Sequence, residues 1–399
     1  MTEISRDPAA DRAARREAGR VRRRRRRRLI AVSVVLALVS PAIYSYTAMI
    51  VKPSSLPVWP RSVEWLRQHH GNWLVDEAEH YYYTWKAPSK GGPQLSRLPL
   101  AGLAVTQRAA ARARPARTAW PPRIRSVFAH PLQGEGIWQR TGRLIHGRPP
   151  VLVTTFRTEV AYPRIVAYVA WFDHTLTSTG YYPGRYEPPS APVRGPMSVP
   201  SSQRWRLLAT YNSGFIYRDG NNGSSIGGVQ YEPLQRGLAT MVSYRDGRVG
   251  IVAWNGGPVA GPEFAFARQS LPLIVDNGRL NPELDNSTKW GFTLGNAVRV
   301  WRTGAGIDRR GNLIYAAADS QTVVTLAKIL QRAGAVRAMQ LDINPEWPTL
   351  ITYSHRRGLG PTMIVPNYQQ SVTRYLVPDD RDFFAVYRRL PGPFTVPFK

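Results

Sequence analysis

Apolar residues fall into two patterns along the chain, one continuous block near the N-terminus and a series of short runs from about residue 127. The block covers residues 29–51 and contains no charged side chain. An α-helix rises about 1.5 Å per residue, so about 20 such residues cross the hydrocarbon layer of a membrane. A membrane helix tolerates Pro41 as a kink, and Tyr44 and Tyr46 lie near the far end, where aromatic rings favour the interface. The block predicts one transmembrane helix.

The residues before this block set its expected orientation. Residues 1–28 contain twelve Arg and four acidic residues, and positions 22–28 are an unbroken Arg run. Basic residues beside a span stay cytoplasmic, which predicts a cytoplasmic tail at 1–28 and an extracytoplasmic location after residue 51. Two alternatives are an Arg run that binds nucleic acid and a cleaved signal peptide. Because the run abuts the span, and the apolar stretch exceeds the about 7–15 residues of a signal peptide, we favour an uncleaved anchor.

The segment 52–126 predicts a juxtamembrane region followed by a basic linker. Ser62 is a candidate cap for a short helix whose apolar contacts come from Val63, Trp65 and Leu66. Residues 87–125 then contain eight basic residues and no acidic one, with many Ala and Pro. This composition favours a linker or solvated stalk, and its charge suits anionic membrane or cell-wall polymers.

From residue 127 onward the pattern is typical of a β-rich domain. Short runs rich in Val, Tyr and other β-formers predict strands, several of them joined by tight turns with Asp-Gly, Asn-Gly or Gly-Asn. The predicted strands cover residues 151–156, 164–171, 207–217, 239–244, 249–254, 271–275, 290–294, 297–302, 306–308, 312–318 and 336–341. Such a meander implies a largely antiparallel sheet.

One helix, over residues 320–333, interrupts this series. Its apolar residues recur at i, i+3, i+4 and i+7, Ser320 is its candidate cap, and Gly334 follows its last turn. A helix followed by a strand late in a β series predicts an α+β fold in which the helix covers one sheet face. The predicted extracytoplasmic domain spans residues 127–399.

Composition excludes several kinds of chemistry. The 399 residues include 54 Lys+Arg, 26 Asp+Glu and no Cys, for a net charge of +28. Without Cys the chain has no disulfide, thiolate zinc site, iron–sulfur cluster or cysteine nucleophile. The part after residue 28 keeps +20 of the +28, since the tail carries +8. That charge is spread out and no recognised nucleic-acid motif appears, so we expect no nucleic-acid partner.

A first candidate site lies where the predicted strand 207–217 runs into Asn212-Ser213-Gly214-Phe215. Gly214 permits close approach of a ligand to the backbone, and the Asn212 amide offers both a donor and an acceptor. The alternative is a strand bulge that binds nothing.

A second candidate is Arg302, followed by Thr303 and by two glycines, Gly304 and Gly306. Arg grips a phosphate by two parallel hydrogen bonds, and nearby glycine N–H groups can form an anion nest. The alternative is an Arg on a solvent-facing strand. The spacing matches neither a Walker loop nor a dinucleotide-binding fingerprint.

A third candidate is the alternation of Asp342, Asn344 and Glu346 at the end of a predicted strand, where Pro345 stops the pairing. Three oxygen side chains there suit a hard cation such as Ca²⁺, or a proton-transfer pair, although they can also simply cap a turn. His355 is the only histidine after residue 174, so a Ser-His-Asp triad in the C-terminal half would have to use it. No G-x-S-x-G elbow accompanies it, which argues against a triad.

The order of these motifs resembles the phosphodiester glycosidase family over roughly residues 205–365. Members read Asn-x-Gly-Phe, then Arg-Thr-x-x-Gly, then a helix, then Leu-Asp-Gly-Gly-Gly-Ser. The matching residues here are Asn212, Gly214, Phe215, Arg302, Thr303, Gly306, Leu341 and Asp342. After Asp342 the chain departs from the family, with residues 343–347 reading Ile-Asn-Pro-Glu-Trp. The family's glycines would give backbone donors to a phosphate, whereas Pro345 has none.

The resemblance implies a membrane-anchored hydrolase that acts on a sugar phosphodiester, or a related glycan of a bacterial cell envelope, outside the membrane. It implies that Arg302 holds the phosphate charge. Asp342 would act as general acid or base or as a cation ligand, and Glu346 would replace the lost glycine contacts or supply a second carboxylate. Implied substrate contacts are Asn212, Gly214, Phe215, Thr303, Gly306, Asn344 and His355. Two alternatives stay open, a non-catalytic protein that binds envelope glycans and a hydrolase of phosphate-free glycans.

Overall fold

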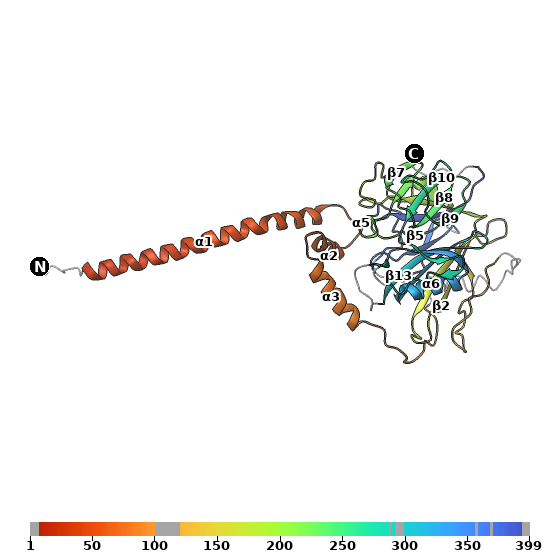
Figure 1. Cartoon of the computed structure of the whole chain (residues 1–399), viewed down its shortest axis with the longest axis horizontal. Helices are drawn as coiled ribbons and strands as arrows, with labels where there is room; N and C mark the ends of the chain where they lie inside the picture. The colour runs from red at the N-terminus through yellow and green to blue at the C-terminus, as the bar shows by residue number, and fades with distance from the viewer. Residues whose placement is uncertain are drawn as a thin grey trace. The chain divides into compact units, whose positions relative to one another are not determined.

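The structure is a computed structural model that describes residues 8–99, 120–286, 289–291, 299–355, 358–367 and 370–392. The chain divides into two compact units, Met1–Asn72 and Trp73–Lys399. Figure 1 labels helices and strands of both units.

The first unit contains the helices α1 (Pro8–Val51) and α2 (Val58–Gln68). Within α1, the stretch Arg22–Val51 is the one helix among the described residues that is long and apolar enough to cross a membrane. Its Leu, Val and Ile side chains are exposed, and Pro41 lies inside it. The length and apolar surface are those that a membrane span requires.

Helix α2 packs on the end of α1. The Tyr46 and Trp65 rings meet edge to face at 5.2 Å, and the Trp65 indole donates a 3.0 Å hydrogen bond to Ser45. The prediction that Ser62 caps this helix is wrong, because α2 already begins at Val58 and the Ser62 hydroxyl donates to the Val58 carbonyl.

The second unit consists of three antiparallel sheets with a few helices, which confirms the α+β prediction. The largest sheet has eight strands in the order β1-β2-β3-β14-β13-β15-β11-β12. They are β1 (Gln139–Arg140), β2 (Val151–Arg157), β3 (Val166–Phe172), β11 (Leu273–Asp276), β12 (Arg279–Leu280), β13 (Val300–Asp308), β14 (Leu313–Gln321) and β15 (Ala335–Gln340).

Two five-stranded sheets, ordered β7-β6-β10-β8-β9 and β17-β16-β5-β18-β4, complete the unit. The first contains β6 (Ser224–Ile226), β7 (Val229–Glu232), β8 (Ala239–Tyr244), β9 (Val249–Ala253) and β10 (Phe264–Gln269). The second contains β4 (Thr177–Tyr182), β5 (Leu207–Asn212), β16 (Leu350–Ser354), β17 (Gly360–Met363) and β18 (Phe383–Arg388). The helical elements are α3 (Asn72–Trp85), η2 (Ser201–Arg206), α5 (Tyr217–Gly220) and α6 (Val323–Arg332).

Local turn chemistry produces the predicted hairpins. The β8–β9 hairpin turns at Asp246-Gly247, where Gly247 has φ +82°, a value that glycine adopts without strain. The β13–β14 hairpin likewise turns at Gly311, with φ +86°. The turn predicted at residues 295–296 lies outside the described residues.

Helix α6 covers one face of the eight-stranded sheet, as predicted, and Figure 1 shows it beside β13. Its cap is Thr322 rather than the predicted Ser320, because Thr322 and Thr325 exchange hydrogen bonds in a capping box. A Cβ on Gly304 would lie 2.8 Å from Leu330 of α6 and 2.9 Å from the Met339 carbonyl. The glycine is therefore needed where the helix packs on β13.

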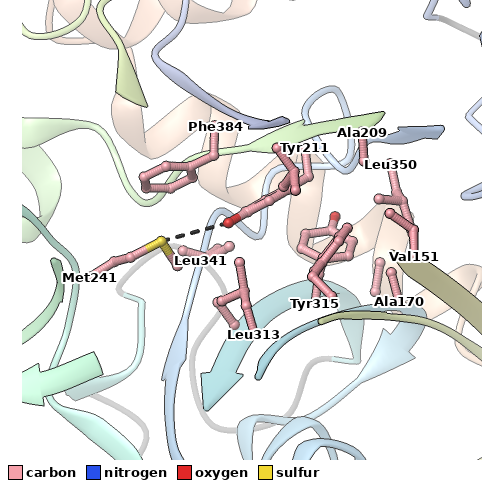
Figure 2. Close-up of a cluster of buried hydrophobic side chains, with 14 of the residues drawn as sticks. Val151, Ala170, Ala209, Tyr211, Met241, Leu313, Tyr315, Leu341, Leu350 and Phe384 are labelled. Carbon is pink, nitrogen blue, oxygen red and sulfur yellow. Dashed lines mark hydrogen bonds between the residues drawn. The ribbon is translucent and has the colours of Figure 1, made fainter. Parts of the chain in front are cut away.

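The largest core cluster joins all three sheets. Figure 2 shows Tyr211 of β5 beside Phe384 of β18, with its hydroxyl directed at the Met241 sulfur of β8. Tyr315 of β14 packs against Tyr211 at 5.0 Å between ring centroids. Since one cluster holds the three sheets together, the loops at their ends are fixed relative to one another.

The described ends of the basic segment 87–125 also contact this unit. Leu98 is buried in the core cluster that joins the sheets, and Ile124 in the cluster beneath α6. The Trp138 indole donates a 2.9 Å hydrogen bond to the Pro122 carbonyl.

Candidate active site

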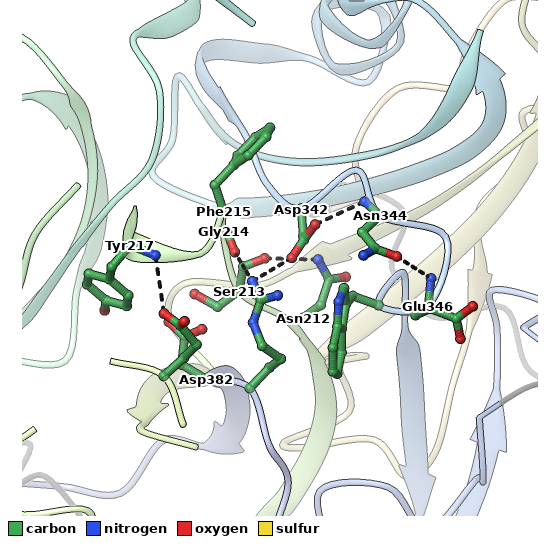
Figure 3. Close-up of polar contacts among 12 residues, drawn as sticks. Asn212, Ser213, Gly214, Phe215, Tyr217, Asp342, Asn344, Glu346 and Asp382 are labelled. Atoms are coloured by element: carbon green, nitrogen blue, oxygen red, sulfur yellow. Dashed lines mark hydrogen bonds and ion pairs between the residues drawn. The ribbon is translucent and has the colours of Figure 1, made fainter. Parts of the chain in front are cut away.

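Three chain segments meet at one place in the second unit, namely the loop after β5, the loop after β15 and the loop before β18. Asn212 ends β5 and pairs with Phe383, the first residue of β18, so the loops beside these two residues are neighbours. The Asp342 backbone N–H, just past the end of β15, donates to the Ser213 carbonyl at 3.2 Å. Figure 3 shows the polar side chains that this junction brings together.

The centre of the junction is a buried ion pair between Asp342 and Arg381. The Arg381 Nη2 lies 2.6 Å from Asp342 Oδ2 and also donates to the Gly214 carbonyl at 3.2 Å. The other carboxylate oxygen of Asp342 accepts the Asn344 N–H, and the Arg381 guanidinium lies over the Trp347 ring at 4.9 Å. Burial raises the pKa of the Asp342 carboxyl, and Arg381 opposes that increase. The carboxylate is thus fixed in position beside a cation.

A second buried ion pair, between Arg268 and Asp382, lies beside the first. Arg268 is a charged residue in the otherwise largely apolar strand β10, and its Nε lies 2.6 Å from Asp382 Oδ2. Its Nη2 donates to the Phe215 carbonyl at 2.8 Å, and its guanidinium lies 4.0 Å from the centre of the Tyr217 ring. This pair therefore holds the loop that follows Gly214.

A third carboxylate, Glu187, completes the cluster. It is half-buried, and its Oε2 accepts the Tyr217 N–H at 3.2 Å. Burial raises the pKa of Glu187 to about 7, even though Arg381 and Arg268 oppose the increase, and Asp382 adds to it. A carboxyl with this pKa changes its protonation state near neutral pH.

Arg302 has different surroundings from Arg381. Its guanidinium donates to the carbonyls of Gln321 and Trp290 and to the side chain of Gln340, at 3.1–3.3 Å. It forms no ion pair with the residues that the structure describes, and burial lowers its pKa to about 10. Arg302 still carries a positive charge at neutral pH, and no carboxylate in the described chain neutralises that charge.

The structure shows no contact between Arg302 and Asp342. A small apolar cluster contains residues near Arg302 and residues near Asp342. It consists of Val300 from β13, Ile343 from the loop after Asp342, and Phe215. The predicted substrate contact Phe215 is thus a packing residue whose side chain is buried in this cluster. A Cβ on Gly214 would lie 3.2 Å from the Ser270 hydroxyl, so close packing within the protein requires the glycine, and the approach of a ligand there stays a prediction.

Asn212 and Thr303 connect strands rather than face a ligand. The Asn212 amide donates to Ser213 and Thr303, and its oxygen accepts from Tyr315 and the Thr349 N–H. Two donor hydrogens and two acceptor positions are then in use, so none remains for a sugar hydroxyl. The Thr303 hydroxyl donates in turn to the Asp342 carbonyl at 2.7 Å. The hydrogen bonds of these two residues thus connect β5, β13 and the backbone at Asp342.

The predicted anion nest at Gly306 is also absent. Gly306 pairs with Ile314 on one side and Ala338 on the other, and a Cβ there would lie 2.6 Å from the Cβ of Ala335. An extended strand between two neighbours has no concave set of N–H groups. The glycine allows close packing within the sheet.

The trio Asp342, Asn344 and Glu346 forms successive turns. Asp342 accepts the Asn344 N–H and Asn344 accepts the Glu346 N–H, each at 3.0 Å. Figure 3 shows the Glu346 carboxylate directed away from Asp342. No cluster of three or more His, Asp or Glu side chains suited to a metal occurs in the described part of the chain. Because Arg381 is bound to Asp342 and the other contacts close turns, these residues fit the turn-capping alternative best.

His355 lies far from this junction. Its ring nitrogen contacts the Leu207 carbonyl at 2.6 Å, at the opposite end of β5 from Asn212. Strands rise about 3.3 Å per residue, so the two ends are about 16 Å apart. The prediction that His355 contacts the same substrate is not supported by this placement.

The family resemblance can be tested by comparison. Residues 206–342 match the model of the phosphodiester glycosidase family. The match covers about a third of the chain and ends at Asp342.

Solved structures with a similar chain course include the catalytic domain of zebrafish N-acetylglucosamine-1-phosphodiester alpha-N-acetylglucosaminidase, auto-inhibited by its pro-peptide, at 14% identity and TM-score 0.42. That comparison covers 63% of this chain and 88% of the zebrafish chain. A hypothetical protein from Synechocystis shows 11% identity and TM-score 0.35, and the comparison covers 60% of this chain and 62% of the Synechocystis chain. A Burkholderia pseudomallei protein described as a putative exported protein shows 10% identity and TM-score 0.36. That comparison covers 58% of this chain and 75% of the other. No curated protein matches the sequence.

Several charged residues around Asp342 were not singled out by the sequence analysis. Arg381, Asp382 and Glu187 lie outside residues 206–342, and Arg268 lies inside. Two signals pointed to them, an Arg within the strand Phe-Ala-Phe-Ala-Arg-Gln and a dense charged run at 379–382 directly before an apolar strand. A charged side chain at a buried position requires a partner of opposite charge or hydrogen bonds. A charged residue inside or next to an apolar strand therefore indicates a buried ion pair.

Proposed function

We propose that this chain is a membrane-anchored, extracytoplasmic hydrolase that cleaves a sugar phosphodiester or a related glycan of the cell envelope. The family match indicates a glycosidase-type hydrolase. The observation that supports the proposal most is the buried Asp342–Arg381 pair, which combines a carboxylate with a phosphate-binding cation at the end of the matched segment. The tail at 1–28 and the apolar stretch of α1 support the anchor and its orientation.

The proposed reaction is hydrolysis at the anomeric carbon. A water oxygen forms a bond to that carbon while the bond from the carbon to the phosphate oxygen breaks, and the electron pair leaves with the phosphomonoester. Glycoside cleavage passes through a transition state with positive charge on the sugar, which the Asp342 carboxylate stabilises. Arg302 and Arg381 offset the negative charge of the phosphate.

The alternative is a glycan-binding protein without catalysis. It is favoured by one observation, that both carboxylate oxygens of Asp342 are already engaged, by Arg381 and by the Asn344 N–H. Pro345 also stands where the family's glycines would donate to a phosphate. Binding of envelope glycans without release of product would support this alternative.

Hydrolysis by the full chain, purified in detergent, decides between the two. Wild type is incubated with a panel of sugar-1-phosphodiesters, with and without Ca²⁺ and with a chelator. We expect sugar and phosphomonoester to appear at rates that neither Ca²⁺ nor the chelator changes, because Arg381 and the Asn344 N–H already engage the two carboxylate oxygens of Asp342.

Asp342→Asn should lower this turnover by about 10²–10⁴-fold while the circular dichroism spectrum stays the same. Asp276→Asn, which removes a partner from the exposed Asp276–Arg337 pair of the same sheet, is the matched control and should retain full activity. Unchanged turnover in Asp342→Asn would remove Asp342 from the mechanism.

A further inference from the structure

Three carboxylates surround the two guanidinium groups of the site, and they are not equivalent. Asp342 and Asp382 each lie 2.6 Å from an Arg nitrogen and are buried. Glu187 forms no ion pair with the described residues, is half-buried, and accepts one backbone N–H, from Tyr217. Of the three carboxylates, Glu187 therefore has the fewest hydrogen-bond and ion-pair partners, and its residue as a whole is the least buried.

The groups that face Glu187 come from three elements. Arg381 and Asp382 precede β18, Arg268 lies on β10, and the Tyr217 N–H begins α5. The positive charges of Arg381 and Arg268 are largely used by Asp342 and Asp382, so they do not outweigh the burial of Glu187. As a result the pKa of Glu187 is raised to about 7, and roughly half of the groups are ionised at neutral pH.

The proposed reaction determines which proton must move. A phosphomonoester has a second pKa of about 6, so it leaves as a stable anion and needs no proton from an acid. Water, in contrast, is a poor nucleophile and gains from a base that accepts its proton during the attack. A base is most effective when its pKa lies near the working pH, because it is then both ionised and sufficiently basic.

We propose that Glu187 is the general base of this site, and that it takes the proton of the attacking water while Asp342 stabilises the positive charge on the sugar. The inference rests on the proposed hydrolysis. As the water oxygen bonds to the anomeric carbon, its proton passes to the Glu187 carboxylate, and the electron pair of the broken bond leaves on the phosphate oxygen. Glu187 then releases the proton to solvent, which its partial exposure permits. Glu346, the second carboxylate expected from the sequence, has no part in this step.

The test compares two glutamates that differ in their position. Glu187→Gln keeps an oxygen that can accept the Tyr217 N–H, and so preserves the local fold. Glu232→Gln is the matched control, because Glu232 also accepts one backbone N–H, from Ser190, but lies on β7. The dependence of kcat/KM on pH is measured for wild type, both variants and Glu346→Gln, in the full chain with a sugar-1-phosphodiester.

We expect wild-type kcat/KM to rise with pH through a midpoint near 7 and then level off. Glu187→Gln should lose about 10²–10⁴-fold of activity together with this rise, while the Glu232 and Glu346 variants keep both. Added formate should restore part of the activity of Glu187→Ala, which a purely structural role would not allow.

Two failures can be told apart. If wild type hydrolyses the substrate but Glu187→Gln keeps its rate and its pH dependence, the assignment of Glu187 is overturned and the proposed function stands. If wild type releases no product from any substrate, the proposed hydrolysis is overturned, and so is the role of Glu187 as its general base.

Discussion

Two glutamates of the same unit, Glu135 and Glu187, show how the surroundings decide the use of a carboxylate. Glu135 is completely buried and forms a two-pronged contact with Arg157, at 3.1 Å to Nε and 2.9 Å to Nη2. It also accepts the N–H groups of Leu132 and Arg157. Burial favours its neutral form, but these hydrogen bonds outweigh burial and hold the pKa of Glu135 below its usual range.

Glu187 has the opposite balance. It accepts one hydrogen bond, its neighbouring guanidinium groups already have carboxylate partners, and its pKa is raised to about 7. A glutamate whose carboxylate oxygens are all bound by an Arg and by backbone N–H groups stabilises the fold. A glutamate without an ion pair is available for proton transfer. The comparison therefore separates a structural pair from a catalytic candidate without reference to any relative.

The largest effect expected from this comparison is on folding. Glu135→Gln removes the charge that neutralises Arg157, whose side chain is 0% exposed, and should lower the free energy of unfolding by about 3–5 kcal/mol. Denaturant unfolding of the full chain in detergent, followed by Trp fluorescence, measures the loss. The molecules that remain folded should keep the pH dependence of turnover.

The control for this change is again Asp276→Asn, whose pair is exposed by 44% and 51% and should cost less than about 1 kcal/mol. Equal stability of Glu135→Gln and Asp276→Asn would contradict the structural role of Glu135.

A somewhat smaller effect concerns stability against pH at Glu187. Its pKa in the folded protein, about 7, exceeds the ordinary value of 4.5, so the folded state binds the proton more tightly. The destabilisation from this group is absent below pH 4.5, grows as pH rises, and is complete above 7. It amounts to at most about 3 kcal/mol.

Glu187→Gln cannot ionise, so its stability relative to wild type should rise by up to about 3 kcal/mol between pH 4 and pH 9. Melting temperatures of both proteins across this range measure the difference. A constant difference at all pH values would mean that Glu187 titrates normally, and the contrast with Glu135 would disappear.

The fold was largely accessible from the sequence because its signals are local. Alternating apolar runs mark β8 and β9, Asp246-Gly247 marks the turn between them, and the apolar spacing marks α6. The cap of α6 was misplaced by two residues, since Ser320 and Thr322 are both acceptable caps and only tertiary packing selects between them.

The site was accessible only in part, because its partners are distant in sequence. Asp342 follows from its position at the end of β15, but Arg381 reaches it only because β18 pairs with β5. No local pattern specifies that pairing. Conversely, Asn212 offered a polar side chain in a suggestive motif, and packing against Tyr315 and Thr303 used all of its hydrogen bonds internally.

The smallest expected effect concerns Arg302. This buried guanidinium extends the comparison from carboxylates with and without an ion pair to arginines with and without one. Arg157 and Arg381 have carboxylate partners, whereas Arg302 has carbonyl and amide oxygens and no ion pair among the described residues. If its charge is met by the phosphate of the substrate, Arg302→Met should raise KM for a sugar phosphodiester about tenfold, which corresponds to about 1.4 kcal/mol. Arg302→Lys should recover part of this, since a lysine keeps the charge but not the planar fork. The pH dependence that belongs to Glu187 should not move in either variant, because Arg302 does not face that carboxylate. Equal KM values in wild type and Arg302→Met would show that the substrate brings no phosphate to this guanidinium, and would favour a phosphate-free glycan.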